Sequence, residues 1–192
     1  MAQPGLQLIA VTLVGTRPLL LDHMGLEDLL SLGSGERLSY EEQCRRHLSV
    51  DAQGKPVLPA SYLMASLRAA GREVKVGRVK VSTKTGTILP SFLTPVGEEF
   101  LIKPGEWQMD NRQARKDGKP VRAIRPRFDR WEVEAMFAFT PRDGLDSSTA
   151  MLLFEIAGHK IGVGAFRREL FGERRGTFFG QFRIKDWEVV DV

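Results

Sequence analysis

The alternation of apolar and polar residues along the chain predicts several β-strands. Residues 6–14 (LQLIAVTLV) are rich in strand-forming residues and apolar on both faces, which is typical of a central strand. In residues 131–140 the apolar side chains recur at every second position, so one face of a strand is expected to be buried. That face carries Trp131, Val133, Ala135, Phe137 and Phe139. Shorter extended segments are expected within residues 50–58, 74–93 and 98–105, and a last strand over 180–190.

Helical periodicity marks the segments between these strands. In residues 60–74 the apolar side chains of Leu63, Leu67 and Ala70 fall on one helix face, and Pro59 suits the start of a helix. A second helix is expected over 39–48, with Ser39 as its N-cap. Two further segments are predicted to be helical: a short one at 25–32, and 147–161, capped by Asp146 or Ser147.

Stripped of insertions, these elements follow the order βαββαβ. This order predicts the α+β class and, within it, a ferredoxin-like (RRM-like) fold in which two helices cover one face of an antiparallel sheet. The other face would be free to bind a partner. The 192 residues fit a single domain over 1–192, with an insertion at 15–55. The polar, basic stretch at 104–126 is expected to protrude as a loop.

Basic residues gather in three segments, although the net charge of the chain is only +4. Residues 103–130 hold nine basic and four acidic residues. Residues 72–84 hold five basic residues against one acidic residue, and residues 162–184 hold five arginines against two glutamates. Charged loops are often simply solvated, but three such segments beside glycines and aromatic residues favour phosphate binding.

The glycine-rich segment before the last strand adds a specific hypothesis. Glycine lets backbone N–H groups approach a phosphate closely, and arginine forks onto phosphate oxygens. Phe166, Phe171, Phe178 or Phe179 could stack on exposed bases, whereas Phe182 belongs to the core. The residues predicted to contact nucleic acid are Lys75, Arg78, Lys80, Arg112, Arg115, Lys116, Arg125, Arg127, Arg130, Gly162, Gly164, Arg167, Arg168, Arg174 and Arg175.

Catalytic chemistry is not evident in the sequence. His23, His47 and His159 lie in separate segments without the spacing of metal ligands, so neither a metal nor another cofactor is expected. His23 beside Asp22 could act in acid–base chemistry, but nothing else converges on this pair. Cys44 beside two arginines could be an activated thiol, and a buried, inert thiol is the favoured interpretation.

Composition also bears on where the protein acts. A single cysteine excludes internal disulfides and multi-cysteine zinc sites, which makes a reducing, cytoplasmic setting the default. No apolar run approaches the roughly 20 residues that span a bilayer, so no membrane partner is expected. The N-terminal stretch lacks the cationic segment of a signal peptide and is interpreted as a strand.

Several motifs resemble the RAMP superfamily, the repeat-associated RNA-binding proteins of CRISPR effector complexes, and in particular its backbone subunits. The helix start Leu58-Pro59-Ala60-Ser61 through Leu67-Arg68 resembles a helix start common in that family. The stretch from Gly162-Val163-Gly164 to Gly176 and Gly180 resembles its C-terminal glycine-rich loop. A closer likeness, over most of residues 55–190, is to bacteriophage proteins with an RPRF-x-x-W strand (Arg125 to Trp131), an AG-x-x-I-G-V-G loop (157–164) and a G-x-F-G-x-F strand (176–182).

This resemblance implies a protein that binds single-stranded nucleic acid, RNA rather than DNA, and self-associates along the strand as a homo-oligomer or ribonucleoprotein subunit. A thumb-like loop at 105–120 would reach a neighbouring subunit. No histidine or aspartate is placed as in RNA-cleaving relatives, so no enzymatic activity is expected. Two alternatives stay open: a RAMP-type RNA endonuclease using His23 or His47, and a phage-encoded protein-interaction module.

Overall fold

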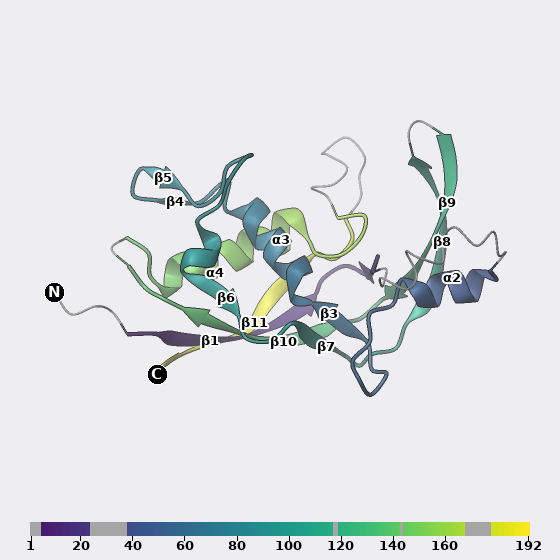
Figure 1. Cartoon of the computed structure of the whole chain (residues 1–192), viewed down its shortest axis with the longest axis horizontal. Coiled ribbons are helices and arrows are strands. Elements are labelled where there is room, and N and C mark those ends of the chain that lie inside the picture. The colour runs from purple at the N-terminus through teal and green to yellow at the C-terminus, as the bar shows by residue number, and fades with distance from the viewer. Residues whose placement is uncertain (1–4, 24–37, 117–118, 143, 168–177) are drawn as a thin grey trace.

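The computed structural model describes residues 5–23, 38–116, 119–142, 144–167 and 178–192, with Arg115 and Lys116 described by their backbone alone. The predicted helix at 25–32 lies outside these residues. The main sheet is built around β1 (Gln7–Gly15), which pairs antiparallel with β10 (Glu132–Phe139) on one side and with β11 (Phe182–Asp191) on the other (Figure 1). The order continues from β10 to β7 (Glu99–Lys103) and β3 (Val57–Pro59), and β6 (Leu93–Pro95) also pairs with β10.

Two helices, α3 (Ala60–Ala70) and α4 (Ser147–Ile156), cover one face of this sheet (Figure 1). The predicted alternation in 131–140 is confirmed, because all five side chains of that face are buried. Phe137 of β10 meets Phe154 of α4 edge-to-face with ring centroids 5.2 Å apart, and Phe154 meets Trp187 of β11 at 5.4 Å. The core therefore lies between the helices and the sheet, and among the described residues no element covers the other face.

The helix ends follow local chemistry. α2 (Tyr40–Arg46) begins at Ser39, whose hydroxyl accepts from the Glu42 amide while the Glu42 carboxylate accepts from the Ser39 amide. α4 begins at Asp146, as one of the two predicted caps, and continues into a π-helical turn, η2 (Ala157–Ile161). α3 ends at Ala70, earlier than the predicted residue 74, because residues 71–74 turn towards the small hairpin of β4 (Lys75–Val76) and β5 (Val79–Lys80).

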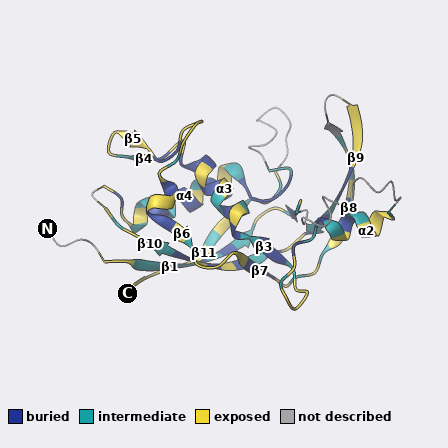
Figure 2. Cartoon of the chain, viewed as in Figure 1, coloured by how far each residue is buried: buried dark blue, intermediate teal, exposed yellow. Residues whose placement is uncertain are grey.

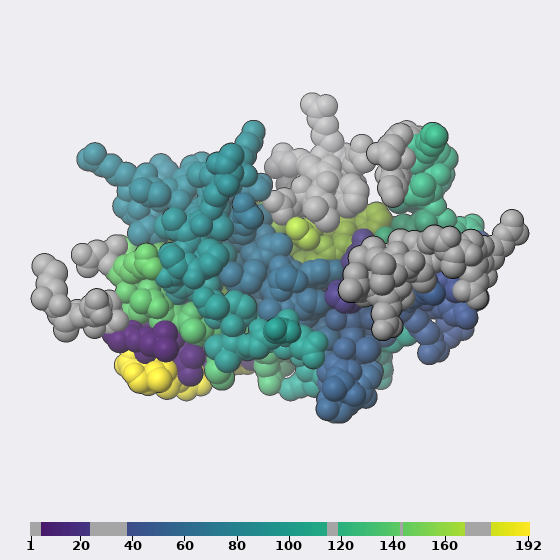
Figure 3. Space-filling view, viewed as in Figure 1, coloured from purple at the N-terminus to yellow at the C-terminus, as the bar shows by residue number. Residues whose placement is uncertain are grey.

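The prediction of a loop at 104–126 is wrong in form, although the segment does protrude. β8 (Gln108–Lys116) and β9 (Lys119–Phe128) make a long antiparallel hairpin that projects from the body of the protein (Figures 1 and 3). Ile124, Pro126 and Phe128 alternate on a buried face, but the arginines between them and the proline hide this pattern in the sequence. β2 (Leu19–Leu20) completes a second sheet beside β9, and η1 (Leu89–Ser91) precedes β6.

The predicted α+β class with mostly antiparallel sheets is confirmed. Along the chain, β1, α3, β6, β10, α4 and β11 occur in the order strand, helix, strand, strand, helix, strand, with other elements interspersed. Figure 2 shows that burial is deepest between the helices and the sheet and that residues 119–122, at the outer end of β9, are exposed. Within the described residues, no helix combines the length and apolarity needed to cross a membrane.

Candidate nucleic-acid interface

The base of the β8–β9 hairpin is tied to the glycine-rich segment through Arg112. Its guanidinium group donates two hydrogen bonds to the carboxylate of Asp110, which is buried. The same group lies 4.3 Å from the ring centroid of Phe179 and 5.5 Å from that of Phe166. One aromatic ring at each end of residues 166–179 therefore contacts the same cation of the hairpin. Cation–π attraction stabilises this arrangement.

The glycines beside this contact are packed against neighbouring backbone. Gly162 and Gly164 are buried with φ of 81° and 79°, in the region that favours glycine. A Cβ at Gly164 would overlap the carbonyl oxygen of Leu20, and one at Gly162 would overlap that of Phe179. The Gly162 amide donates to Ala157 and the Ala165 amide to Leu20, so these groups are used inside the protein. The structure thus gives both glycines a packing role, and a direct phosphate contact stays a prediction.

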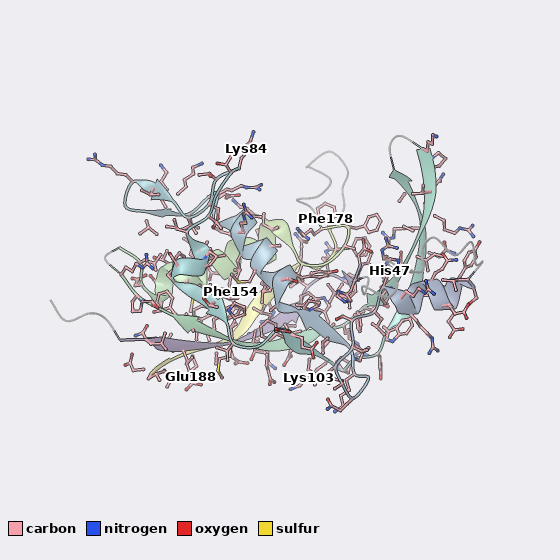
Figure 4. The ribbon with its side chains drawn as sticks, in the orientation of Figure 1. His47, Lys84, Lys103, Phe154, Phe178 and Glu188 are labelled. Carbon is pink, nitrogen blue, oxygen red and sulfur yellow. The ribbon has the colours of Figure 1, made fainter. Side chains whose placement is uncertain are left out.

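A second cluster lies where the hairpin base meets α2 and the end of β2. The carboxylate of Asp22 lies 3.0 Å from Nδ1 of His47 and 2.9 Å from Nε of Arg125. Nη1 of Arg125 lies 3.0 Å from Nε2 of His47. The histidine and arginine side chains are only 11% and 19% exposed, whereas Asp22 is 44% exposed. The three groups form a closed ring of contacts, and Figure 4 shows His47 between α2 and the hairpin.

The contact with Arg125 orients the imidazole ring of His47. A guanidinium group can only donate hydrogen bonds, so Nε2 of His47 must accept from Arg125. Nδ1 is then the ring nitrogen that faces the Asp22 carboxylate. Burial acts to raise the pKa of Asp22, but the hydrogen bond from His47 and the charge of Arg125 outweigh it, and the pKa is lowered overall. The cluster therefore favours the ionised form of the Asp22 carboxylate, which lies beside both His47 and Arg125.

Two neighbouring groups are unsuited to proton transfer near neutral pH. Burial and the Asp22 charge raise the pKa of Tyr62, at the start of α3, to about 12. Burial raises the pKa of the Cys44 thiol to about 11, and its side chain is fully buried. Cys44 is thus buried as predicted, and its raised pKa disfavours the reactive thiolate form.

Two of the arginines predicted to position phosphates are held in ion pairs. Arg125 takes part in the Asp22 cluster, and Arg127 donates to Asp129 at 2.7 Å and lies 3.6 Å from Asp110. Each is engaged on one side by a carboxylate, so only part of each guanidinium group faces outwards. Arg130 differs from them: it is exposed, and within the described residues no carboxylate lies within ion-pair distance of it. It borders a hollow of the hairpin base together with Trp107, Gln108 and Asp129.

The other residues predicted to contact nucleic acid lie in separate parts of the structure. Arg167 donates to the carbonyl of Gly164, next to the Arg112 contact. Phe178 is 48% exposed at the other end of that segment, and Phe182 is buried as predicted. Arg168, Arg174, Arg175 and Phe171 lie outside the described residues, and the side chains of Arg115 and Lys116 are not described. Lys75, Arg78 and Lys80 lie on the β4–β5 hairpin, at the opposite end of the molecule from β8 and β9 (Figure 1).

The uncovered face of the main sheet is acidic in places and does not resemble a phosphate-binding surface. Glu132 and Glu134 of β10 and Asp186 and Glu188 of β11 are cross-strand neighbours of β1 residues on that face. Figure 4 shows Glu188 and Lys103 on this side of the sheet, away from Lys84 and Phe178. The arginine-bearing groups of the candidate interface therefore gather on the hairpin and glycine-rich segment, not on the open sheet face.

No family model matches the chain, and no curated protein matches it by sequence. Among solved structures, it is similar to a chain of a cryo-EM structure described as "Type III-B Cmr-beta bound to cognate target RNA". The TM-score is 0.55 at 15% sequence identity, and the match covers 97% of this chain and 61% of that one. The chain thus shares the fold of that protein and spans about three-fifths of its length.

Proposed function

We propose that this protein binds single-stranded nucleic acid, RNA in preference to DNA, without cleaving it, and that copies associate along the strand. The observation that carries the proposal is the contact of Arg112 with Phe166 and Phe179. This contact joins the projecting basic hairpin to Phe166 and Phe179, and the neighbouring Phe178 is exposed. A single strand presents phosphates, which bind cations, and unstacked bases, which stack on exposed aromatic rings.

The fold supports the choice of partner. We assign the core to the ferredoxin-like plan of the RAMP superfamily, because the similar chain covers almost all of this one and belongs to an RNA-bound assembly. On this assignment the β8–β9 hairpin corresponds to the thumb that the sequence resemblance implies. RNA is favoured over DNA because the similar chain belongs to an RNA-bound assembly. Binding should weaken steeply with salt, because counterions are released from the phosphates.

The geometry of His47 supports a role in binding over one in cleavage. Both of its ring nitrogens face protein groups, Nδ1 towards Asp22 and Nε2 towards Arg125. A general base must have a free nitrogen within hydrogen-bond reach of the substrate. The endonuclease alternative would therefore depend on His23, and incubation of labelled RNA with the wild type and His23→Ala, followed by gel analysis, tests it. Cleavage by the wild type that the substitution abolishes would contradict the proposal.

Fluorescence anisotropy tests the binding itself. Labelled single-stranded RNA, single-stranded DNA and duplex of one sequence would be titrated at two salt concentrations. The test variant replaces Arg167, Arg168, Arg174 and Arg175 by alanine, and a control variant replaces Lys55, Lys103, Arg183 and Lys185, which are exposed elsewhere. We expect tight, salt-sensitive binding to RNA that the test variant loses and the control retains. Equal, weak binding by all three proteins would instead favour the protein-interaction alternative.

A further inference from the structure

Two surfaces on opposite sides of the molecule carry opposite charge and are not accounted for by the candidate interface. The first is the tip of the β4–β5 hairpin, where Lys75, Arg78 and Lys80 are exposed around Val79, which is 60% exposed. The second is the open face of the main sheet near β11. In Figure 4 the label Lys84 marks the side of the hairpin, and the label Glu188 marks the side of the open sheet face.

The hairpin is electrostatically unbalanced. Lys75 and Lys80 are direct cross-strand partners, and like charges placed opposite each other destabilise a two-stranded ribbon. Among the described residues, no carboxylate lies within ion-pair distance of these lysines or of Arg78, and the nearby Glu73 already pairs with Lys160. A partner that supplies carboxylates would relieve this repulsion and could also cover Val79.

The open sheet face offers the matching features. Ala10 pairs with Met136 on one side and Glu188 on the other, and Thr12 pairs with Glu134 and Asp186. A hollow lies over these residues, with Met136 exposed at its side and one cation, Lys185, in its lining. Glu134 is paired with Lys103 and Glu132 with Lys185. By contrast, Asp186 and Glu188 are exposed, and neither has a cation within ion-pair distance in the described parts of the chain.

We infer that the β4–β5 hairpin of one copy docks on the open sheet face of a second copy. Val79 would enter the hollow over Ala10 and Met136, and the three cations of the hairpin would face Asp186 and Glu188. The two surfaces are different and lie on opposite sides of the chain, so the contact is heterologous and joins copies head to tail. Complementary charge would steer and orient the encounter.

A second copy fits the hairpin better than nucleic acid does. An exposed valine at the centre of the contact offers a phosphate backbone neither a hydrogen bond nor a charge. The hairpin also lies at the other end of the molecule from Arg112 and Phe179, where the nucleic-acid groups gather (Figure 1). The inference deepens the self-association in the proposed function, but it requires no RNA, so the two can fail separately.

Sedimentation velocity of nuclease-treated, RNA-free protein over a range of concentrations tests the contact. One variant reverses the hairpin (Lys75→Glu with Lys80→Glu), a second reverses the face (Asp186→Lys with Glu188→Lys), and a third carries all four changes. A control variant, Lys55→Glu with Glu155→Lys, reverses the same number of exposed charges elsewhere. Circular dichroism checks that each variant is folded.

We expect the wild type and the control to associate in a concentration-dependent manner. Each reversed variant alone should lose association by at least about tenfold in Kd, because like charges then meet in the contact. The four-fold variant, and an equimolar mixture of the two reversed variants, should associate again, since opposite charges are restored. A wild type that stays monomeric at all concentrations, or no restoration in folded variants, would overturn the inference.

Binding to an RNA too short for two copies separates the two roles of the hairpin. The inference removes Lys75 and Lys80 from the residues expected to contact nucleic acid. The hairpin-reversed variant should therefore lose no more affinity for such an RNA than Lys55→Glu with Lys103→Glu, which makes the same change in net charge at exposed positions. If affinity falls while association is retained, the hairpin contacts nucleic acid and the inference is wrong. If the inference holds and RNA binding is absent, the proposed function fails alone.

Discussion

The guanidinium group of Arg112 lies 4.3 Å from the ring centroid of Phe179 and is held there by the buried carboxylate of Asp110. One residue thereby connects two parts of the chain that are both rich in arginine. Since Asp110 fixes one edge of the group and Phe179 covers its face, the position of the hairpin depends on the ends of the glycine-rich segment.

Arg112→Lys tests this connection. Lysine keeps the charge but cannot form the bidentate bond to Asp110 or stack as a plane on Phe179, so we expect a loss of about 1–2 kcal/mol in the free energy of unfolding. RNA affinity should fall several-fold because the two arginine-bearing parts are no longer held together. Urea denaturation and anisotropy measure the two effects. Arg68→Lys, at an exposed position of α3, serves as the control, and equal behaviour of both variants would contradict the connection.

Gly164→Ala tests the packing of the glycine-rich segment. The added Cβ would overlap the Leu20 carbonyl oxygen at a positive φ, so we expect a destabilisation of about 2–4 kcal/mol. Gly86→Ala is the matched control, because no atom lies within 4 Å of the position of its Cβ. Thermal or urea unfolding compares them. A Gly164→Ala protein as stable as the control would show that the segment can shift without cost.

The elements of the core could be predicted from the sequence because their signals are local. The alternation in 131–140, the Ser39 capping box and the Asp146 cap each depend on residues only a few positions apart. The β8–β9 hairpin was missed because its outer half pairs through backbone groups, which carry no side-chain pattern, and only its base is buried.

The candidate site was only partly predictable for a related reason. The arginines were identified by composition, but the carboxylates that hold Arg125 and Arg127 cannot be assigned without the fold. Asp22, His47 and Arg125 come together from three segments, and no spacing in the sequence relates them. Likewise, glycines that pack against backbone and glycines that bind phosphate look the same in a sequence, as Gly162 and Gly164 illustrate.

Stability at acid pH should depend on Asp22. Its pKa is lowered in the folded protein, so it contributes stability that is present above its ordinary pKa and is lost as the pH falls through the lowered value. Asp22→Asn should therefore be less stable than the wild type at neutral pH, and the difference should shrink below about pH 4. Urea unfolding at a series of pH values measures this. Glu155→Gln is the control on an exposed carboxylate, and a difference that does not change with pH would argue against the cluster.

Arg130 and Arg125 should respond differently to the same substitution, although both were predicted to contact phosphate. Arg130 is exposed at the edge of the hollow that contains Trp107, so Arg130→Gln should leave the free energy of unfolding within about 0.5 kcal/mol of the wild type. If Arg130 contacts a phosphate of a single strand, its loss should reduce the slope of log K against log salt by about 0.7.

Arg125→Gln should instead act on stability. Its removal leaves Asp22 and Nε2 of His47 without the guanidinium group, so we expect a loss of about 1–3 kcal/mol in the free energy of unfolding. The salt slope of the folded variant should change less than that of Arg130→Gln, because Arg125 already neutralises a carboxylate of the protein. Anisotropy titrations at four salt concentrations, alongside urea unfolding, compare the two variants. If the two variants have equal salt slopes and equal free energies of unfolding, then ion pairing inside the hairpin base does not determine which arginines contact the nucleic acid.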